Sequence, residues 1–277
     1  MDGLVLDRAI ASVFRLDDRG ARMRWRERKL ATRPASAAAL VVEVRDPCRL
    51  TPAERAALLE RCARANMAIY ASARVTDDPA IPRRMAAQLG LEPLDAGPLA
   101  EAEGIARVPW HTAGHDSVPG RPVRSMLLHC VQAAGAGGEL SLLDAELAWL
   151  LLGDIDTRFV AALMQRDAMT IPHAGCRLPA FAVEASGDLH LRFTERRDGV
   201  AWKCDATVSE AAARLRRLLD RDASCVLKMR LAPGMGLVAN NVLQSRSALA
   251  EGESVVRRAR FQRRIAGTEG AWRALLG

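Results

Sequence analysis

Residues 111–116, which read His-Thr-Ala-Gly-His-Asp, hold the side chains of this chain that are best suited to chemistry. Imidazole and carboxylate groups suit several divalent metals, so His111, His115 and Asp116 could together form a metal site. The alternative is that His115 and Asp116 are an exposed loop pair that faces water. We favour this alternative, because adjacent residues of an extended chain point in opposite directions. For His111 itself, a metal ligand and a histidine that is hydrogen-bonded in a polar pocket are equally good interpretations.

A second polar segment, far along the chain, carries Asn240, Asn241, Gln244 and Arg246. It lies on a predicted strand that we expect to enter a pocket. Buried side-chain amides need hydrogen-bond partners, so a ligand or an ordered water among these groups is one hypothesis. The other hypothesis is a local hydrogen-bond network that locks the last strands together.

These two segments resemble the two parts of the iron site in the taurine dioxygenase / γ-butyrobetaine hydroxylase superfamily. Residues 109–116 resemble its His-x-Asp motif, and residues 240–246 resemble the segment that supplies its last histidine. The resemblance extends over roughly Thr51 to Ile265. It is carried in the expected order by Leu-His-Cys at 128–130, Gly-Gly-Glu at 137–139, and the segments 167–172, 189–194 and 236–241.

The resemblance implies an iron site that has lost two of its three ligands. In this family two histidines and one carboxylate hold iron(II) on one face, and the other face is open to 2-oxoglutarate and oxygen. His111 keeps the first ligand position, but Ala113 stands where the carboxylate is expected and Gln244 where the distal histidine is expected. A methyl group has no lone pair, and a neutral amide oxygen is a weak donor. We therefore expect no iron at the usual site.

The arginine that binds 2-oxoglutarate in the family is also displaced in this chain. The resemblance places it near Ser254 or Val255, neither of which can pair with a carboxylate. Arg257, Arg258 and Arg260 follow closely, and Arg258 stands where relatives carry a second arginine that can reach an anionic substrate. The resemblance thus implies a non-canonical member that uses neither iron(II) nor 2-oxoglutarate as a cofactor and whose pocket binds a small, anionic molecule.

Two alternatives stay open. One is an active oxidoreductase, an iron(II)/2-oxoglutarate oxygenase or halogenase with a rearranged ligand set; halogenases of this superfamily also replace the carboxylate by Ala or Gly, and His-Thr-Ala matches their signature. Those enzymes keep the distal histidine and the arginine, which argues against this alternative. The other is a regulatory partner of an active paralogue. Because relatives commonly form homo-oligomers, we expect this chain to form a homo-oligomer or to pair with such a paralogue.

Bulk properties exclude several classes of protein. The net charge of +7 invites a nucleic-acid partner, but aromatic residues make up only 4% of the chain, too few for base stacking, so no nucleic acid is expected. No apolar run reaches the roughly 18 residues of a membrane span, so no membrane partner is expected. Six cysteines lie dispersed without a Cys-x-x-Cys pair, and the N-terminus lacks the order of a signal peptide. These features predict a cytoplasmic protein.

Hydrophobic periodicity and capping signals predict the elements that position the site. Thr51, Pro52 and Glu54 predict a helix start, with the helix running to about Ala65. We expect further helices at 81–89, 144–152, 156–164 and 207–219, the last capped by Thr207. Strands are expected at 67–72, 224–231, 236–239 and 255–265. His129 and His190 lie in apolar strands, so we expect them to be core histidines. Near the N-terminus, strand-like pieces at 5–16 and 39–44 flank a basic turn.

The expected fold class is mainly β with flanking helices (α+β), of the jelly-roll type. The resemblance narrows this to the double-stranded β-helix of the oxygenase superfamily. We expect a short strand-containing segment at 1–48, followed by the jelly-roll domain at 49–277.

Overall fold

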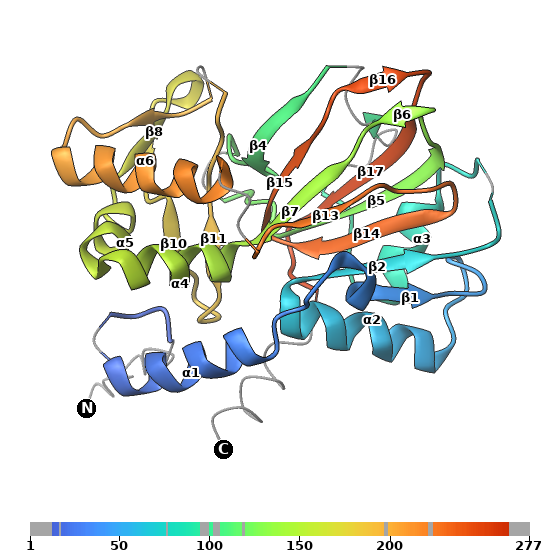
Figure 1. Ribbon diagram of the computed structural model, residues 1–277, viewed down its shortest axis with the longest axis horizontal. Helices are drawn as coiled ribbons and strands as arrows, with labels where there is room; N and C mark the ends of the chain where they lie inside the picture. Colours follow the sequence, from blue (N-terminus) through green and yellow to red (C-terminus); the bar gives the residue numbers. More distant parts are fainter. Residues whose placement is uncertain are drawn as a thin grey trace, which may run out of the picture.

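A computed structural model describes residues 13–16, 18–75, 77–94, 100–101, 106–117, 120–196, 199–220 and 224–265. Two main β-sheets form the body of the protein (Figure 1). The larger sheet has the order β1 (Val41–Glu43), β2 (Met67–Ala71), β14 (Met235–Asn240), β5 (Ser125–Gln132), β17 (Val255–Phe261), β3 (Ala100–Glu101). The smaller has the order β13 (Leu227–Met229), β7 (Leu140–Asp144), β15 (Val242–Arg246), β4 (Val108–Thr112).

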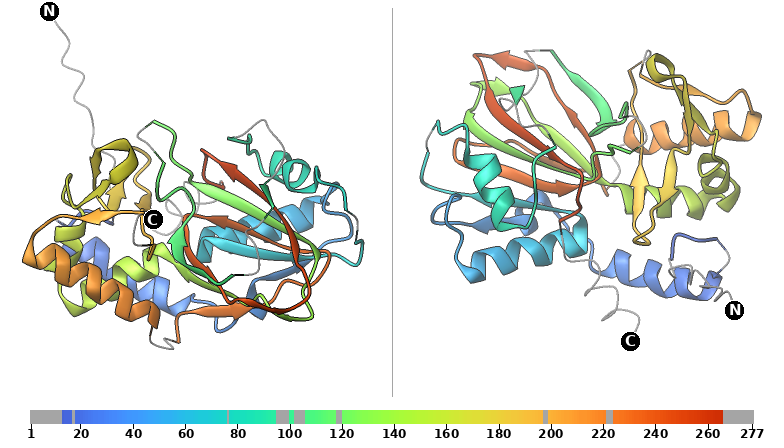
Figure 2. Two further views of the ribbon diagram at one scale, coloured as in Figure 1. Left: turned by 90° about the horizontal axis from the view of Figure 1, so that it is seen from above. Right: turned by 180° about the vertical axis from the view of Figure 1, so that it is seen from behind.

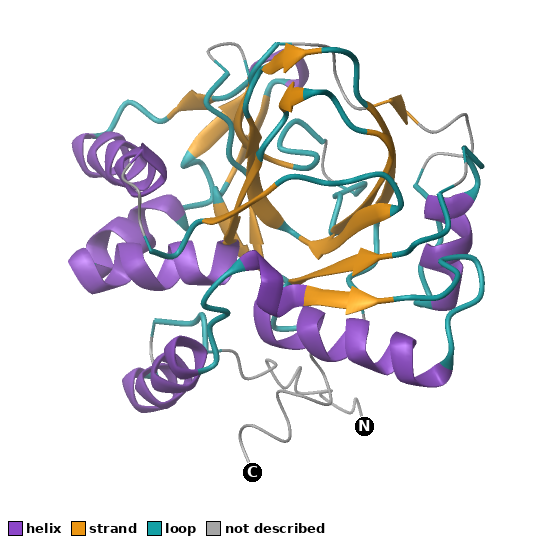
Figure 3. Ribbon diagram, turned by 45° about the vertical axis from the view of Figure 1, so that its right-hand side comes forward, coloured by secondary structure: helices purple, strands orange, loops and turns teal. Residues whose placement is uncertain are grey.

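The two sheets face each other across a shared apolar interior. Along each strand, alternate side chains point inward, as the period of a β-strand requires. Met126 and Leu128 of the larger sheet pack with Leu142 and Val242 of the smaller. Figure 3 shows the strands around this interior with the helices outside it. The arrangement confirms the predicted α+β, jelly-roll fold class.

Two helices cover the outer face of the larger sheet. These are α2 (Pro52–Ala65) and α3 (Ile81–Gln88), seen against the sheet from behind in Figure 2. Thr51 caps α2 through the predicted capping box, with Glu54 as the second member. Leu58 of α2 and Met85 of α3 are fully buried against the outward side chains of the sheet.

A second layer lies beside the smaller sheet, on the left in Figure 1. It contains helices α4 (Ala145–Ile155), α5 (Thr157–Leu163) and α6 (Ala206–Asp220), with the short strands β8 (Met169–Ile171), β9 (Cys176–Leu178), β10 (Phe181–Val183), β11 (Leu189–Leu191) and β12 (Ala201–Trp202). The remaining elements are β6 (Ala136–Gly137), β16 (Leu249–Glu251) and the 3-10 turns η1 (Ala37–Leu40) and η2 (Pro172–Ala174). Within the described ranges, no helix has the length and apolarity needed to cross a bilayer.

The predicted cap of α6 is wrong. The carboxylate of Asp205 accepts a hydrogen bond from the backbone N–H of Val208 at 3.0 Å, so the helix begins before Thr207. Both residue types are good caps, and Asp205 comes first along the chain. The predicted core histidines are confirmed: His129 and His190 are 0% and 2% exposed, and the Nδ1 of His129 lies 2.9 Å from the hydroxyl of Tyr70.

The predicted basic turn near the N-terminus is also wrong, because helix α1 (Arg19–Ala31) occupies it. Asp18 caps this helix, and its Arg, Lys, Glu, Ala and Leu residues are good helix formers. Trp25 is buried, with its ring 5.1 Å from that of Phe14 and 6.1 Å from that of Trp149. Of the first predicted strand, at 5–16, residues 13–16 form a turn, and residues 1–12 lie outside the described part. The second predicted strand, at 39–44, contains β1.

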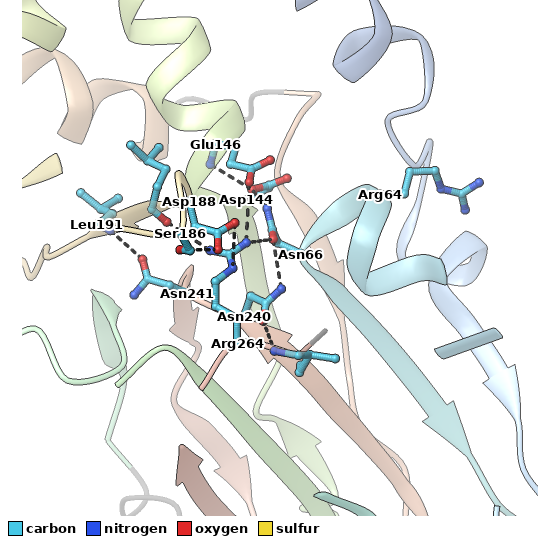
Figure 4. Close-up of polar contacts among 12 residues, drawn as sticks. Arg64, Asn66, Asp144, Glu146, Ser186, Asp188, Leu191, Asn240, Asn241 and Arg264 are labelled. Atoms are coloured by element: carbon cyan, nitrogen blue, oxygen red, sulfur yellow. Dashed lines mark hydrogen bonds and ion pairs between the residues drawn. The ribbon is translucent and has the colours of Figure 1, made fainter. Parts of the chain in front are cut away.

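A buried polar cluster joins α1 to the two sheets. The ammonium of Lys29 lies 2.5 Å from a carboxylate oxygen of Asp144 and 2.7 Å from one of Glu146. Asn66 donates to Asp144 at 2.9 Å and accepts from Arg264 at 2.7 Å. Figure 4 shows Asn66 between the acidic residues and Arg264. Segments that are distant in the sequence therefore meet at one point.

Burial and opposite charge compete within this cluster. Burial alone would lower the pKa of Lys29, but attraction to Asp144 and Glu146 outweighs it and raises that pKa. For Glu146 burial is likewise outweighed, by Lys29 and Arg264, and its pKa is lowered. The pKa of Asp144 is raised because burial and the neighbouring Glu146 outweigh Lys29. Lys29 is thus the cation on which both carboxylates depend.

We expect Lys29→Met to reduce the free energy of unfolding by about 3–5 kcal/mol, because it leaves two buried carboxylates without their shared cation. Urea unfolding measures this loss. The matched control is Arg26→Met on the same helix. Arg26 pairs with Asp154 where both side chains are about a third exposed, so its loss should cost ~0–1 kcal/mol. Equal losses in the two variants would contradict the role given to Lys29.

Candidate functional site

His111 and Gln244 lie side by side at the inner face of the smaller sheet. Strands β4 and β15 are antiparallel, and these two residues are direct partners in the register. Paired residues point to the same face, here the interior between the sheets. The Nε2 of Gln244 lies 3.3 Å from the Nε2 of His111 and 3.3 Å from the sulfur of Met126, on β5 of the opposite sheet. The two positions that the sequence placed at one site are therefore adjacent.

The hydrogen bonds of His111 define which of its nitrogens carries the proton. Its Nδ1 lies 2.9 Å from the carbonyl oxygen of Pro109. A carbonyl oxygen only accepts, so Nδ1 is the donor and the lone pair of the neutral ring is on Nε2. The amide N–H of Gln244 donates to that lone pair. The sulfur of Met126 is a weak acceptor on the same amide nitrogen, which favours this orientation of the amide.

The side chains at this position differ from the iron(II) ligand set that the resemblance implies. A metal would need the Nε2 lone pair of His111, which already accepts from Gln244. Ala113 packs against the apolar interior cluster and offers no donor atom. Among the residues that the structure describes, no three His, Cys, Asp or Glu side chains are grouped closely enough to hold a metal ion.

His115 approaches His111, whereas Asp116 does not. The two imidazole rings are 5.9 Å apart between centroids and meet nearly edge-on, at 74°. The Nδ1 of His115 donates to the carbonyl oxygen of Thr112 at 3.1 Å, which leaves its Nε2 with a lone pair. Asp116 is exposed in the turn that follows β4. The hypothesis of an exposed loop pair therefore describes Asp116 but not His115.

Asn240 and Asn241 tie segments of the chain together. The side chain of Asn240 accepts from the backbone N–H of Ile265 at 2.9 Å and donates to Asn66 at 3.2 Å. The side chain of Asn241 accepts from the backbone N–H of Leu191 at 2.8 Å. These contacts favour the second of our two hypotheses, a network that locks the last strands in place.

Arginines line the interior on β17. Arg258 pairs in register with Leu128, and Arg260 pairs with Met126, so both share the inner face with those residues. Arg260 is therefore the arginine of this strand beside the contact between Met126 and Gln244. The sequence alone could have predicted that Arg260 points inward only if the inward position of Met126, its partner on the adjacent strand, had been known.

The other basic positions of this region have separate roles. Arg257 points to the opposite face and pairs with Asp77 at 3.2 Å. Arg246, also on the inner face of β15, is 9% exposed and donates to the carbonyl oxygen of Ala106 at 3.0 Å. Ser254 donates to the carbonyl oxygen of Gln132 at 3.2 Å and has no charge to offer a carboxylate.

Comparison with known sequences gives one relevant match. No protein-family profile matches the chain. A uridine-5'-phosphate dioxygenase from Amycolatopsis sp. is 32% identical over 144 residues, which are 48% of this chain and 50% of that protein. The match thus spans about half the length of that relative.

Comparison with solved structures defines the class of fold. The PvcB protein from Pseudomonas aeruginosa superposes with a TM-score of 0.61 at 18% identity, over 80% of this chain and 84% of that one. The non-haem iron oxygenase OrfP, solved in complex with iron, gives 0.58 at 12%, over 78% and 80%. The asparagine oxygenase AsnO gives 0.57 at 16%, over 87% and 88%. The chain has the fold of the non-haem iron oxygenases.

The hydrogen bond between Gln244 and His111 predicts the titration of His111. In Gln244→Glu a carboxylate of the same shape can only accept, so it should hold a proton on Nε2 and raise the pKa of His111. Imidazole ¹⁵N NMR across a pH titration measures both the tautomer and the pKa. Exposed His173 is the internal control and should not change. Wild-type protein with the proton on Nε2 of His111 would contradict the arrangement.

Proposed function

We propose that this protein is a small-molecule-binding or repurposed member of the oxygenase fold, rather than a conventional iron(II)/2-oxoglutarate oxygenase. The observation that carries the proposal is the 3.3 Å contact between the amide nitrogen of Gln244 and the Nε2 of His111. This contact satisfies within the protein the lone pair that a metal would use. The methyl group of Ala113 supports the same conclusion, because it sits among apolar side chains where the family would place a carboxylate.

The proposed ligand of this inner face is an anionic small molecule. Arg258 and Arg260 face the interior, with Arg246 on the opposite sheet. Guanidinium groups recognise carboxylates and phosphates through paired hydrogen bonds. The uridine-5'-phosphate dioxygenase that matches half of this chain acts, by its name, on a molecule that carries a phosphate, which supports an anionic ligand here.

A metal titration tests the proposal. Anaerobic addition of iron(II) with 2-oxoglutarate to the purified protein should give no metal-to-ligand charge-transfer band, because one strong ligand remains. A band that saturates at micromolar iron would contradict the proposal. Loss of such a band in His115→Gln would then favour the alternative, an active oxygenase or halogenase with a rearranged ligand set, for which the approach of His115 to His111 is the supporting observation.

Restoring the two missing ligands tests whether the site is shared. The double variant Ala113→Asp with Gln244→His should be less stable than wild type without metal, because a buried aspartate costs several kcal/mol through desolvation or protonation. Iron(II) or manganese should recover that stability by binding the folded state only. Melting temperatures with and without metal measure both effects.

The matched control for this repair is Ala113→Asn with Gln244→Leu, which brings side chains of similar size without a strong metal ligand. Turnover of 2-oxoglutarate need not return, because the arginine of the family position is still absent. If the repaired variant gains no more from metal than wild type and the control do, then positions 113 and 244 do not contribute to one metal site.

A further inference from the structure

The strands that carry His111 and Gln244 present a different set of residues on their outer face. Because side chains alternate, Trp110 and Ser245 point away from the interior. They line a hollow of about 380 Å³, where the outer face of the smaller sheet meets the end of α6. The hollow therefore lies on the opposite face of the smaller sheet from His111 and Gln244, and Arg246 at the end of β15 borders it.

A row of polar side chains crosses the floor of the hollow. Lys228 on β13 pairs with Ser141 on β7, and Ser141 pairs with Ser245 on β15. Directly paired residues place their Cβ atoms about 5 Å apart on one face, so the ammonium and both hydroxyls can reach one ligand. Both serines are among the residues that line the hollow.

The charge around the hollow favours an anion. Arg107 and Arg246 also line it, and among the described residues of its lining Glu139 is the acidic one. Arg246 already donates to the carbonyl oxygen of Ala106. Arg107 is 64% exposed and lies 3.9 Å from Glu195, a contact too long and too exposed to hold it firmly. Basic groups with neighbouring hydroxyl donors are well suited to a phosphate or carboxylate head.

The opposite wall of the hollow is apolar. It is formed by Trp110, Leu219 and Val226, of which Trp110 and Leu219 are 4% and 5% exposed. An indole edge with two aliphatic side chains offers a surface for a planar apolar group. Small-molecule sites commonly combine such a wall with a few polar groups that set the orientation of the ligand.

We propose that this outer hollow is a second binding site, for a small organic anion that joins a phosphate or carboxylate head to an apolar ring. Lys228, Ser141 and Ser245 hold the head, and Trp110 with Leu219 and Val226 contacts the ring. Lys228, Ser141, Ser245 and Trp110 lie on the opposite face of the smaller sheet from His111 and Gln244, so the proposed contacts do not use those two residues.

Phenyl phosphate is a direct probe of this site in the full chain. The indole ¹H–¹⁵N signal of Trp110, assigned with Trp110→Phe, should shift saturably as the probe is added. Lys228→Gln and the pair Ser141→Ala with Ser245→Ala should each weaken binding by roughly tenfold or more, as expected when charge-assisted hydrogen bonds are removed. Benzoate should bind at the same signal if a carboxylate serves as the head, whereas inorganic phosphate, lacking the ring, should bind more weakly.

Two control variants locate the binding. Lys203→Gln removes a lysine charge that pairs with Asp167, away from the hollow, and Arg260→Gln changes the inner pocket. Neither should alter the affinity read from Trp110, and unchanged melting temperatures would show that all variants fold. Absence of a saturable shift at millimolar probe would overturn the proposal. So would binding that survives Lys228→Gln but is lost in Arg260→Gln.

Discussion

The buried contact of Lys29 with Asp144 and Glu146 is the interaction on which the arrangement of the layers depends. Asp144 is the last residue of β7 and the N-cap of α4, so it lies where the smaller sheet passes into the helical layer. Lys29 of α1 forms an ion pair with Asp144 at this point. Asn66, at the end of α2, and Arg264, after β17, complete the cluster. A buried ion cluster adds little net stability over apolar packing, but breaking it is costly, so it selects one arrangement of these segments.

The place of His111 and Gln244 beside each other rests on strand pairing as well as on that anchoring. Here β4 and β15 are joined by their ladder and by the hydrogen bond from Gln244 to His111, which contributes about 1 kcal/mol. Such a bond cannot hold the two sheets in register. The apolar interior and the cluster at Lys29 do so instead.

Much of the fold could be predicted from local signals, but contacts between distant segments could not. The capping box at Thr51 and the start of the last strand at Val255 need only neighbouring residues, and both were predicted correctly. Helix α1 has local signals, the Asp18 cap and good helix formers, but its run of arginines led to the prediction of a turn; only its packing partner Trp149 lies far along the chain. The role of Asn240 as a tie to Ile265, and the place of Arg260 beside Met126, likewise follow from strand pairing that no local pattern reveals.

The alternation of β4 and β15 also links the two faces of the smaller sheet. His111 and Gln244 point inward, while their neighbours Trp110 and Ser245 point outward, and the register between β15 and β4 shifts between Gln244 and Arg246. A slip of one residue in either strand would exchange the inner set for the outer one, placing an indole in the pocket and an imidazole in the hollow. Apolar packing on both faces of the smaller sheet therefore opposes such a slip. The residues packed on each face help to fix the register that places the residues of the other face.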